Sequence, residues 1–221
     1  MNENAIATEI GGLVDGVGAP IMRAAYALKA KPSWITVSEA SGTGNASVDV
    51  TAPAYKGREG RSGSITVTVG KLTEEVTLQQ AGSNIWDVTT KTLSFVKGGE
   101  KKSFTGNSNL ASITFAVDAD ASAWLTAGKL TVNEQTFASG AAITGDPGAS
   151  NVYAFSIDFT ASANGTVSTR TGHITVNGTK YTVSQAAGDA TLSVTPTSLS
   201  FTAAGETKQI SIKSNTAWTI S

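Results

Sequence analysis

The chain has 221 residues, 40% of them hydrophobic, and its 16 basic and 17 acidic residues give a net charge of −1. This composition is typical of a folded protein, and the absence of a basic block argues against binding to nucleic-acid phosphates. Because the chain contains no Cys, disulfides, zinc–thiolate sites and Cys nucleophiles are excluded.

Residues 1–30 differ from the rest of the chain. Their apolar residues fall on one helical face, at Ile6, Ile10, Leu13, Val14 and Val17. Three alternatives stay open: a short helix packed on its own module, an anchor that becomes ordered on a partner, and a frayed tail. No basic residue precedes Arg23 and no apolar run reaches membrane-spanning length. We therefore expect neither a general secretory signal nor a membrane-spanning helix.

Residues 31–83 are predicted to form β-strands. Apolar residues alternate with polar ones at 48–50 and again at 65–69, as in strands with one buried face. A turn at Gly70-Lys71 would pair Ile65 with Val76 in an antiparallel hairpin.

Residues 84–188 show that the chain is built from repeats. The segment Val48–Ala52 recurs 109 residues later as Ile157–Ala161, and Arg61–Val67 recurs at the same offset as Arg170–Val176. Asn177-Gly178, a strong hairpin signal, pairs Ile174 with Tyr181 and His173 with Thr182. The pairs Ile65–Val76 and Ile174–Tyr181 are equivalent, so the longer first hairpin keeps its register.

A second repeated block extends into residues 189–221. The segment Leu93–Lys102 recurs 106 residues later as Leu199–Lys208, and Ser108-Asn109-x-Ala111 recurs as Ser214-Asn215-x-Ala217. The whole module of about 100 residues is therefore expected only at 84–188. Residues 31–83 carry its later half and residues 189–221 its earlier half.

The middle module carries extra residues near 129–150, which predict either an added hairpin or a long loop. Such a loop is either a place for function or a tolerated insertion. About seven short antiparallel strands per complete module indicate an immunoglobulin-like sandwich. The predicted fold class is thus all-β, with tandem immunoglobulin-like β-sandwich modules after a short N-terminal, possibly helical, segment.

Three motifs carry a resemblance to a known family. They are the Trp-Ile/Leu-Thr starts at Trp34 and Trp124, the Arg-x-Gly-x-Ile-Thr-Val strands, and the closing Val183-x-Gln185-Ala186-Ala-Gly. Over residues 33–82, 91–188 and 190–221 the chain resembles the BACON domain, a Bacteroidetes-associated, carbohydrate-binding, often N-terminal domain. The family occurs in surface glycan-processing proteins and in structural proteins of phages that infect those bacteria. The resemblance implies a binding or spacer module rather than an enzyme.

The residues that usually carry catalysis do not form a site in the sequence. His173, the only histidine, is expected to face outward, without a nucleophile and an orienting carboxylate beside it in sequence. Asp118-x-Asp120 offers only two of the ligands that calcium needs, so a solvated loop is favoured. Asp49 and Asp158 belong to different modules, so solvation or protection of a strand edge is favoured over a glycosidase pair. We expect no catalytic, cofactor-binding or metal-binding residues and no cofactor.

The four tryptophans allow glycan binding without showing it. Trp34 and Trp124 begin equivalent segments, which favours a repeated core role. Trp86 lies at a module junction, where it could hold neighbouring modules together. The burial of Trp218 depends on what completes its module. None has an aromatic neighbour two residues away that would build a flat platform for sugar rings.

Two functional hypotheses follow. The favoured one is a non-enzymatic phage virion component, such as a capsid decoration, head fibre or tail protein, located in the virion and assembled in the host cytoplasm. Residues 1–30 and the C-terminal partial module would then bind other virion proteins or further copies of the chain. The alternative is a carbohydrate-binding module at the bacterial cell surface. The signal-free N-terminus favours the virion.

The two partial modules are complementary, because each contains the half that the other lacks. Three explanations stay open. The third module continues beyond Ser221; a partner or another copy completes the halves by strand addition; or residues 1–30 rebuild the first module.

Overall fold

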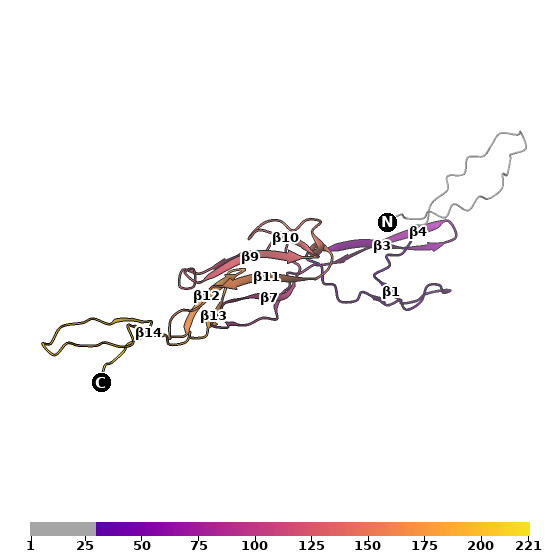
Figure 1. Cartoon of the computed structure of the whole chain (residues 1–221). Helices are drawn as coiled ribbons and strands as arrows, with labels where there is room; N and C mark the ends of the chain where they lie inside the picture. Colours follow the sequence, from indigo (N-terminus) through magenta and orange to yellow (C-terminus); the bar gives the residue numbers. More distant parts are fainter. Residues whose placement is uncertain (1–29) are drawn as a thin grey trace, which may run out of the picture. The chain divides into compact units, whose positions relative to one another are not determined.

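The computed structural model describes residues 30–221, and their regular secondary structure is almost entirely β-strand (Figure 1). The chain separates into two compact units. The N-terminal unit is Met1–Ala54 with Arg61–Ala81, and the C-terminal unit is Tyr55–Gly60 with Gly82–Ser221. The predicted all-β class is confirmed, whereas the prediction for residues 1–30 lies, apart from its last residue, outside the described part.

Two antiparallel strand pairs build the described part of the N-terminal unit. The strands are β1 (Thr36–Val37), β2 (Val50–Thr51), β3 (Arg61–Val69) and β4 (Leu72–Gln80). Strand β1 pairs with β2, and β3 pairs with β4 in a hairpin in which Ile65 lies opposite Val76, as predicted. Gly70 occupies the turn with a φ of 60°, a left-handed conformation that glycine adopts at little cost.

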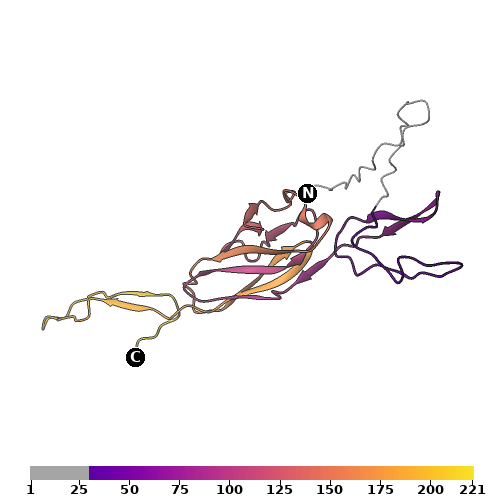
Figure 2. The ribbon, with the colours of Figure 1, turned by 90° about the vertical axis from the view of Figure 1, so that its right-hand side faces the viewer.

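A complete two-layer sandwich forms the centre of the C-terminal unit (Figure 2). The strand order is β10-β9-β11-β7-β5 in the first sheet and β6-β13-β12-β8 in the second. The bounds of the first sheet are β5 (Trp86–Val88), β7 (Glu100–Ser108), β9 (Leu125–Val132), β10 (Gln135–Phe137) and β11 (Tyr153–Ala161). Those of the second are β6 (Leu93–Phe95), β8 (Phe115–Val117), β12 (Arg170–Val176) and β13 (Thr179–Gln185). Strand β6 runs parallel to β13, and the other strand pairs are antiparallel.

The core of the sandwich comes from alternate residues on both sheets. Phe104, Ile157 and Phe159 of the first sheet are at most 1% exposed, as are Ile174 and Val176 of the second. This alternation is what the sequence pattern predicts for strands with one buried face. Burial of these side chains supplies the main stabilising term of the sandwich.

Two turns of the sandwich confirm the sequence predictions. Asn177 and Gly178 both have positive φ, and the hairpin that they close pairs Ile174 with Tyr181 and His173 with Thr182. The extra residues form the β9–β10 hairpin, which turns at Asn133-Glu134, followed by a short 3-10 helix, η1 (Pro147–Ala149). The added-hairpin alternative is therefore correct.

The last part of the C-terminal unit contains β14 (Leu192–Thr195) and β15 (Ser211–Ser214). Their register repeats that of β5 and β7, because Leu192 lies opposite Ser214 as Trp86 lies opposite Ser108. We call residues 190–221 the last half-module. The predicted boundaries at 31–83, 84–188 and 189–221 stay a prediction.

Candidate functional site

A polar cluster of Asp118, Asp120, His173, Thr175 and Lys180 lies where the loop after β8 meets β12 and β13. His173 Nδ1 lies 2.6 Å from Asp120 Oδ2, and the His173 backbone N–H donates to Asp120 Oδ1 at 3.1 Å. The hydrogen bond from the imidazole lowers the pKa of Asp120 below its ordinary value. Sequence reasoning named Asp120 but missed its pairing with His173, because the two residues are far apart in sequence. The pairing of β8 with β12 brings the two together.

The two aspartates of the polar cluster have separate sets of partners. Asp118 accepts a hydrogen bond from Thr175 Oγ1 at 2.8 Å and pairs with Lys180 Nζ at 3.1 Å, so its partners differ from those of Asp120. No group of three or more His, Cys, Asp or Glu residues within 30–221 could hold a metal ion. Within the same residues, the only hydrogen-bond partner of the His173 ring is Asp120. The contacts of the cluster within residues 30–221 are those of a surface ion-pair network.

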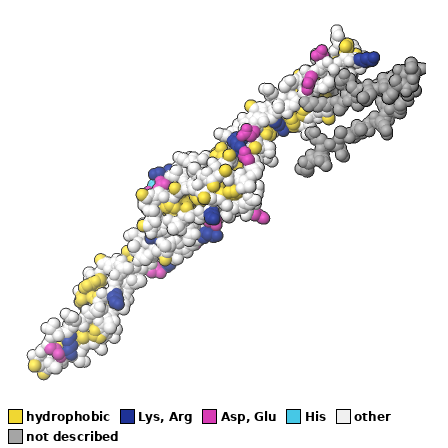
Figure 3. All heavy atoms as spheres, turned by 90° about the horizontal axis from the view of Figure 1, so that it is seen from above, with side chains coloured by type: hydrophobic (Ala, Val, Ile, Leu, Met, Phe, Trp, Pro, Cys, Tyr) yellow, Lys and Arg dark blue, Asp and Glu magenta, His cyan; other side chains and the backbone are white. Residues whose placement is uncertain are grey.

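Charges of both signs are mixed on the face of the molecule shown in Figure 3. On the face shown in Figure 3, basic and acidic side chains lie next to one another rather than in a patch of one sign. Asp158 follows this pattern, because it accepts hydrogen bonds from Ser103 Oγ at 2.7 Å and Lys101 Nζ at 3.0 Å. These two contacts, Ser103 first, lower the pKa of Asp158. Asp49, its equivalent in the N-terminal unit, is exposed.

Two of the tryptophans occupy equivalent places with unequal burial. Trp124 is 6% exposed, meets the edge of Phe95 at 6.3 Å between ring centroids, and carries the Arg170 guanidinium 4.9 Å above its ring. Its predicted core role is confirmed. Trp34 is only half-buried, although Arg61 lies over its ring at 4.4 Å in the same manner.

The other two tryptophans are not equivalent to each other. Trp86 stacks on Phe155 with 4.9 Å between ring centroids, and both rings belong to the same sheet of the complete sandwich. The Trp86 Nε1 atom is buried without a hydrogen-bond partner in the described structure. Trp218 is 53% exposed in the last half-module.

An asparagine clamp recurs at Asn109 and Asn215. Asn109 Nδ2 donates to the carbonyls of Lys56 at 3.0 Å and Ser83 at 2.7 Å, while its Oδ1 accepts the Ile85 N–H at 2.7 Å. Asn215 makes the equivalent three bonds, each of 2.9 Å, to the carbonyls of Gly165 and Asp189 and to the Thr191 N–H. The sequence motif Ser-Asn-x-Ala marked this position, but its role emerges only from the contacts.

A glutamine with several side-chain hydrogen bonds also recurs, and between described residues Gln80 makes one kind of bond fewer than Gln185. Gln185 accepts from Arg170 Nε at 2.7 Å, and its Nε2 donates to the carbonyls of Val96 at 2.9 Å and Ser162 at 2.8 Å. Gln80 accepts from Arg61 Nε at 2.9 Å and donates to the Pro53 carbonyl at 2.8 Å. The equivalent of the Val96 carbonyl would be that of Thr202, in the last half-module.

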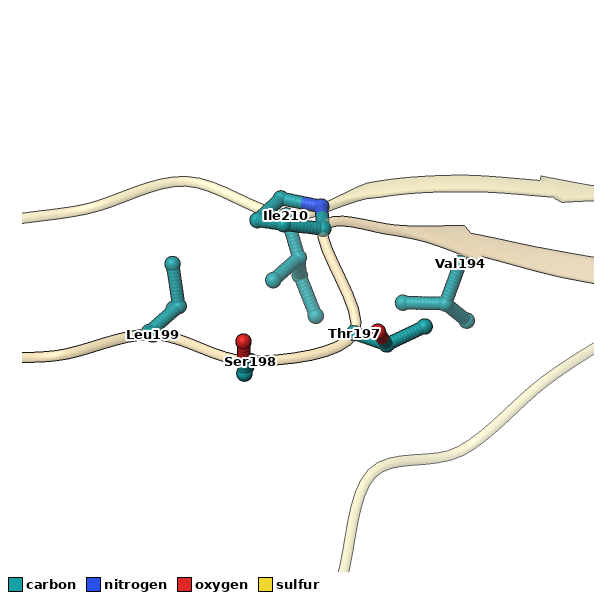
Figure 4. A pocket seen from close by; sticks show the side chains of 6 residues that line it. Val194, Thr197, Ser198, Leu199 and Ile210 are labelled. Atoms are coloured by element: carbon teal, nitrogen blue, oxygen red, sulfur yellow. The ribbon is translucent and has the colours of Figure 1, made fainter.

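An apolar hollow opens in the last half-module, with a volume of about 410 Å³. Figure 4 shows Val194 and Leu199 around it, with Ile210 reaching toward the segment of Thr197 and Ser198. The repeat equivalents of Val194, Leu199 and Ile210 are all core residues of the complete sandwich: Val88, Leu93 and Phe104. The hollow therefore corresponds, through the repeat, to part of the core of the complete sandwich.

Comparison with known proteins gives one family match. Residues 25–81 match the BACON family model, described as "Putative binding domain, N-terminal". The match covers the described part of the N-terminal unit and the segment 55–60. No curated protein matches the chain.

Two solved structures of a surface-layer protein are also similar to the chain. Domains 4 and 5 of the S-layer protein SbsC share 13% identity at a TM-score of 0.31, with coverage of 63% of this chain and 61% of that one. Domains 4–9 of surface layer protein SbsC share 15% identity at a TM-score of 0.32, with coverage of 68% and 21%. The chain thus spans less than two thirds of either.

Proposed function

We propose that this chain is a non-enzymatic binding and display protein of the bacterial cell surface, and that its N-terminal unit binds carbohydrate. The observation that carries the proposal is the match of residues 25–81 to a binding-domain family model. The repeated strand registers and the repeated asparagine clamp support a display role, because they build successive modules in the same way. Within residues 30–221, no helix is long and apolar enough to cross a membrane.

Trp34 is the residue that we assign to carbohydrate contact. It is the only aromatic residue within 30–54 and 61–81, and it is half-buried. Aromatic rings bind the apolar faces of sugars, and the Arg61 guanidinium beside Trp34 carries hydrogen-bond donors suited to sugar hydroxyls. The equivalent ring of Trp124 is covered by its own module and cannot serve this role.

Affinity electrophoresis of the full chain through gels containing bacterial and plant polysaccharides tests the proposal. We expect at least one polysaccharide to retard the chain, and Trp34→Ala to abolish the retardation while far-UV circular dichroism is unchanged. His173→Ala, on the outer face of the complete sandwich, is the matched control and should be retarded like the wild type. Equal retardation of Trp34→Ala, or none with any polysaccharide, would contradict the proposal.

The virion hypothesis remains a second prediction. It depends on the composition of residues 1–30, of which 1–29 lie outside the described part of the chain, and no comparison above bears on it. Its test is the genomic neighbourhood, where capsid and portal genes next to this gene would favour a virion component. The anchoring role of residues 1–30 is likewise a proposal, tested by deleting them and measuring attachment.

A further inference from the structure

The segment Tyr55–Gly60 connects β2 to β3 in the chain but folds with the complete sandwich. Strands β2 and β3 belong to the N-terminal unit, whereas this segment, which we call the strap, belongs to the C-terminal unit. Two carbonyls of the strap accept hydrogen bonds from that unit. The Ser83 N–H donates to the Gly57 carbonyl at 3.1 Å, and Asn109 Nδ2 donates to the Lys56 carbonyl at 3.0 Å.

The surface that receives the strap lies in the extra residues of the middle module, at the short helix η1. The Arg58 N–H donates to the Gly148 carbonyl at 2.9 Å. The next N–H of the strap, that of Glu59, donates to the Ala149 carbonyl at 2.9 Å, and the Tyr55 hydroxyl reaches the same carbonyl at 3.4 Å. Consecutive main-chain bonds of this kind hold the strap against η1 in one register.

An ion pair joins the same two segments. The Arg58 guanidinium donates to both carboxylate oxygens of Asp146, at 3.1 and 2.5 Å, and to the Asn109 carbonyl at 2.9 Å. Bidentate, charge-assisted hydrogen bonds are among the stronger polar contacts and fix the geometry of both partners. The hydrogen bond from Arg58 lowers the pKa of Asp146, so this carboxyl group stays charged at neutral pH.

The main chains of the strap and η1 approach each other so closely that a side chain does not fit between them. Gly57 is buried, and a Cβ atom placed there would lie 2.6 Å from the Ala149 carbonyl oxygen and 2.3 Å from the Tyr55 hydroxyl oxygen. Glycine is the residue that permits such close approach of two backbones. The ion pair and the glycine are thus independent features that both favour the docked strap.

The contacts of the strap leave the hydrophobic core of the sandwich untouched. Its partners named above, Ser83, Asn109, Asp146, Gly148 and Ala149, are not members of that core. Opening of the strap would therefore break polar contacts without exposing the apolar side chains that stabilise the sandwich. Such local openings require less free energy than global unfolding.

We propose that the extra residues of the middle module are a docking surface for the strap, and that the docked strap shields the connection between β2 and β3 from proteases. Exposed connections are preferred sites of proteolytic nicking, and Lys56 and Arg58 make the strap a substrate for trypsin-like enzymes. Opening and closing of the strap as one unit, separate from unfolding of the sandwich, would control its cleavage. The inference goes beyond the proposed function and does not depend on it.

Limited trypsin digestion of the full chain, followed by mass spectrometry, tests the shielding. The rate of cleavage after Arg58 is divided by the rate after Lys71, which is exposed in the β3–β4 turn. Asp146→Asn keeps the size of the side chain but removes its charge. We expect this ratio to rise about tenfold in the variant, because cleavage follows the population of the open strap.

A second variant opens the strap without changing a charge. Gly57→Ala should raise the same ratio, whereas Gly98→Ala should not, because no atom lies within 4 Å of a Cβ atom placed at Gly98. Asp158→Asn is the matched control for Asp146→Asn, because it removes a carboxylate that accepts a lysine hydrogen bond elsewhere on the sandwich. A ratio that stays at the wild-type value in both strap variants, or rises equally in the controls, would overturn the proposal.

Hydrogen exchange followed by NMR separates opening of the strap from unfolding of the sandwich. In wild type, the amides of Arg58 and Glu59 should exchange more slowly than free amides but faster than those paired between β12 and β13. Asp146→Asn should accelerate exchange in the strap and leave the β12–β13 amides at their wild-type rates. Equal wild-type rates in the strap and in these strands, or equal acceleration by Asp146→Asn, would show that the strap opens only with the whole sandwich and would refute the proposal.

Discussion

The paired strands of the two partial modules repeat registers of the complete sandwich, yet the side chains on them are buried to very different extents. The β14–β15 pair repeats the register of β5–β7, and Thr36 lies opposite Thr51 as Thr126 lies opposite Thr160. Phe104 nevertheless is 1% exposed, whereas its equivalent Ile210 is 40% exposed.

This difference shows that strand pairing depends on short sequence segments, whereas burial depends on contacts between distant segments. Turn residues and alternation set the pairing of neighbouring strands, and both features are present in each half. Burial needs the opposite sheet, and among residues 30–221 two facing sheets are present in the middle of the chain. The predictions below test this separation from the largest expected effect to the smallest.

Trp124→Ala should cost about 3–5 kcal/mol of unfolding free energy, as removal of a buried aromatic ring does. Trp34→Ala, the matched change in the N-terminal unit, should cost about 1–2 kcal/mol because its ring is only half-buried in the single chain. Urea unfolding followed by far-UV circular dichroism, at a concentration where the chain is monomeric, measures both. Equal costs would mean that Trp34 is already covered within one chain.

Asn109→Ala should cost about 2–3 kcal/mol, because it leaves buried carbonyl and N–H groups without partners. Asn109 is fully buried, whereas Asn215 makes the same three bonds in an exposed place. Asn215→Ala should therefore cost only about 0.5–1 kcal/mol, since water replaces the lost partners. The same urea titrations decide, and a larger loss for Asn215 would contradict this account.

The strand registers were predictable from sequence because they depend on short segments. The pairing of Ile174 with Tyr181 follows from Asn177-Gly178 alone, and the alternation of Ile157 and Phe159 indicates which face is buried. The repeat then transfers each assignment to its equivalent. The same reasoning assigned a core role to Trp124 and to Trp34, and only the first is buried.

Contacts between distant segments were not predictable in the same way. Asp120 reaches His173 only because β8 lies beside β12, and no sequence spacing encodes that adjacency. Asn109 was visible as part of a motif, but its partners at Lys56 and Ser83 come from two separate loops. The recurrence of Asn in the Ser-Asn-x-Ala motif, outside the alternating apolar positions of the strands, is the signal that could have indicated a structural hydrogen-bonding role.

Gly178→Ala and Gly70→Ala should cost about 1 kcal/mol each, because both glycines adopt positive φ, where a Cβ atom is strained. This effect should be the same in the complete sandwich and in the N-terminal unit, since the strain is local to the turn. No other atom lies within 4 Å of a Cβ placed at either position, so packing adds nothing. Thermal unfolding measures both variants, and a several-fold difference between them would show that the turns depend on more than local geometry.

Asp158→Asn should cost only about 0.5 kcal/mol at neutral pH, since exposed ion pairs are screened by solvent. Hydrogen bonds from Ser103 and then Lys101 lower the pKa of Asp158 below 3.8 in the folded chain. The carboxylate therefore stabilises the fold above about pH 4, and this contribution disappears as the pH falls through the lowered folded-state pKa. The difference in unfolding free energy between wild type and Asp158→Asn should be constant from pH 5 to 7 and shrink toward pH 2.

Ser103 is the larger cause of the lowered pKa of Asp158. Ser103→Ala should therefore raise this pKa more than Lys101→Met does, as measured by NMR titration. A pH-independent difference for Asp158→Asn would show that these contacts do not favour the charged form of the Asp158 carboxyl.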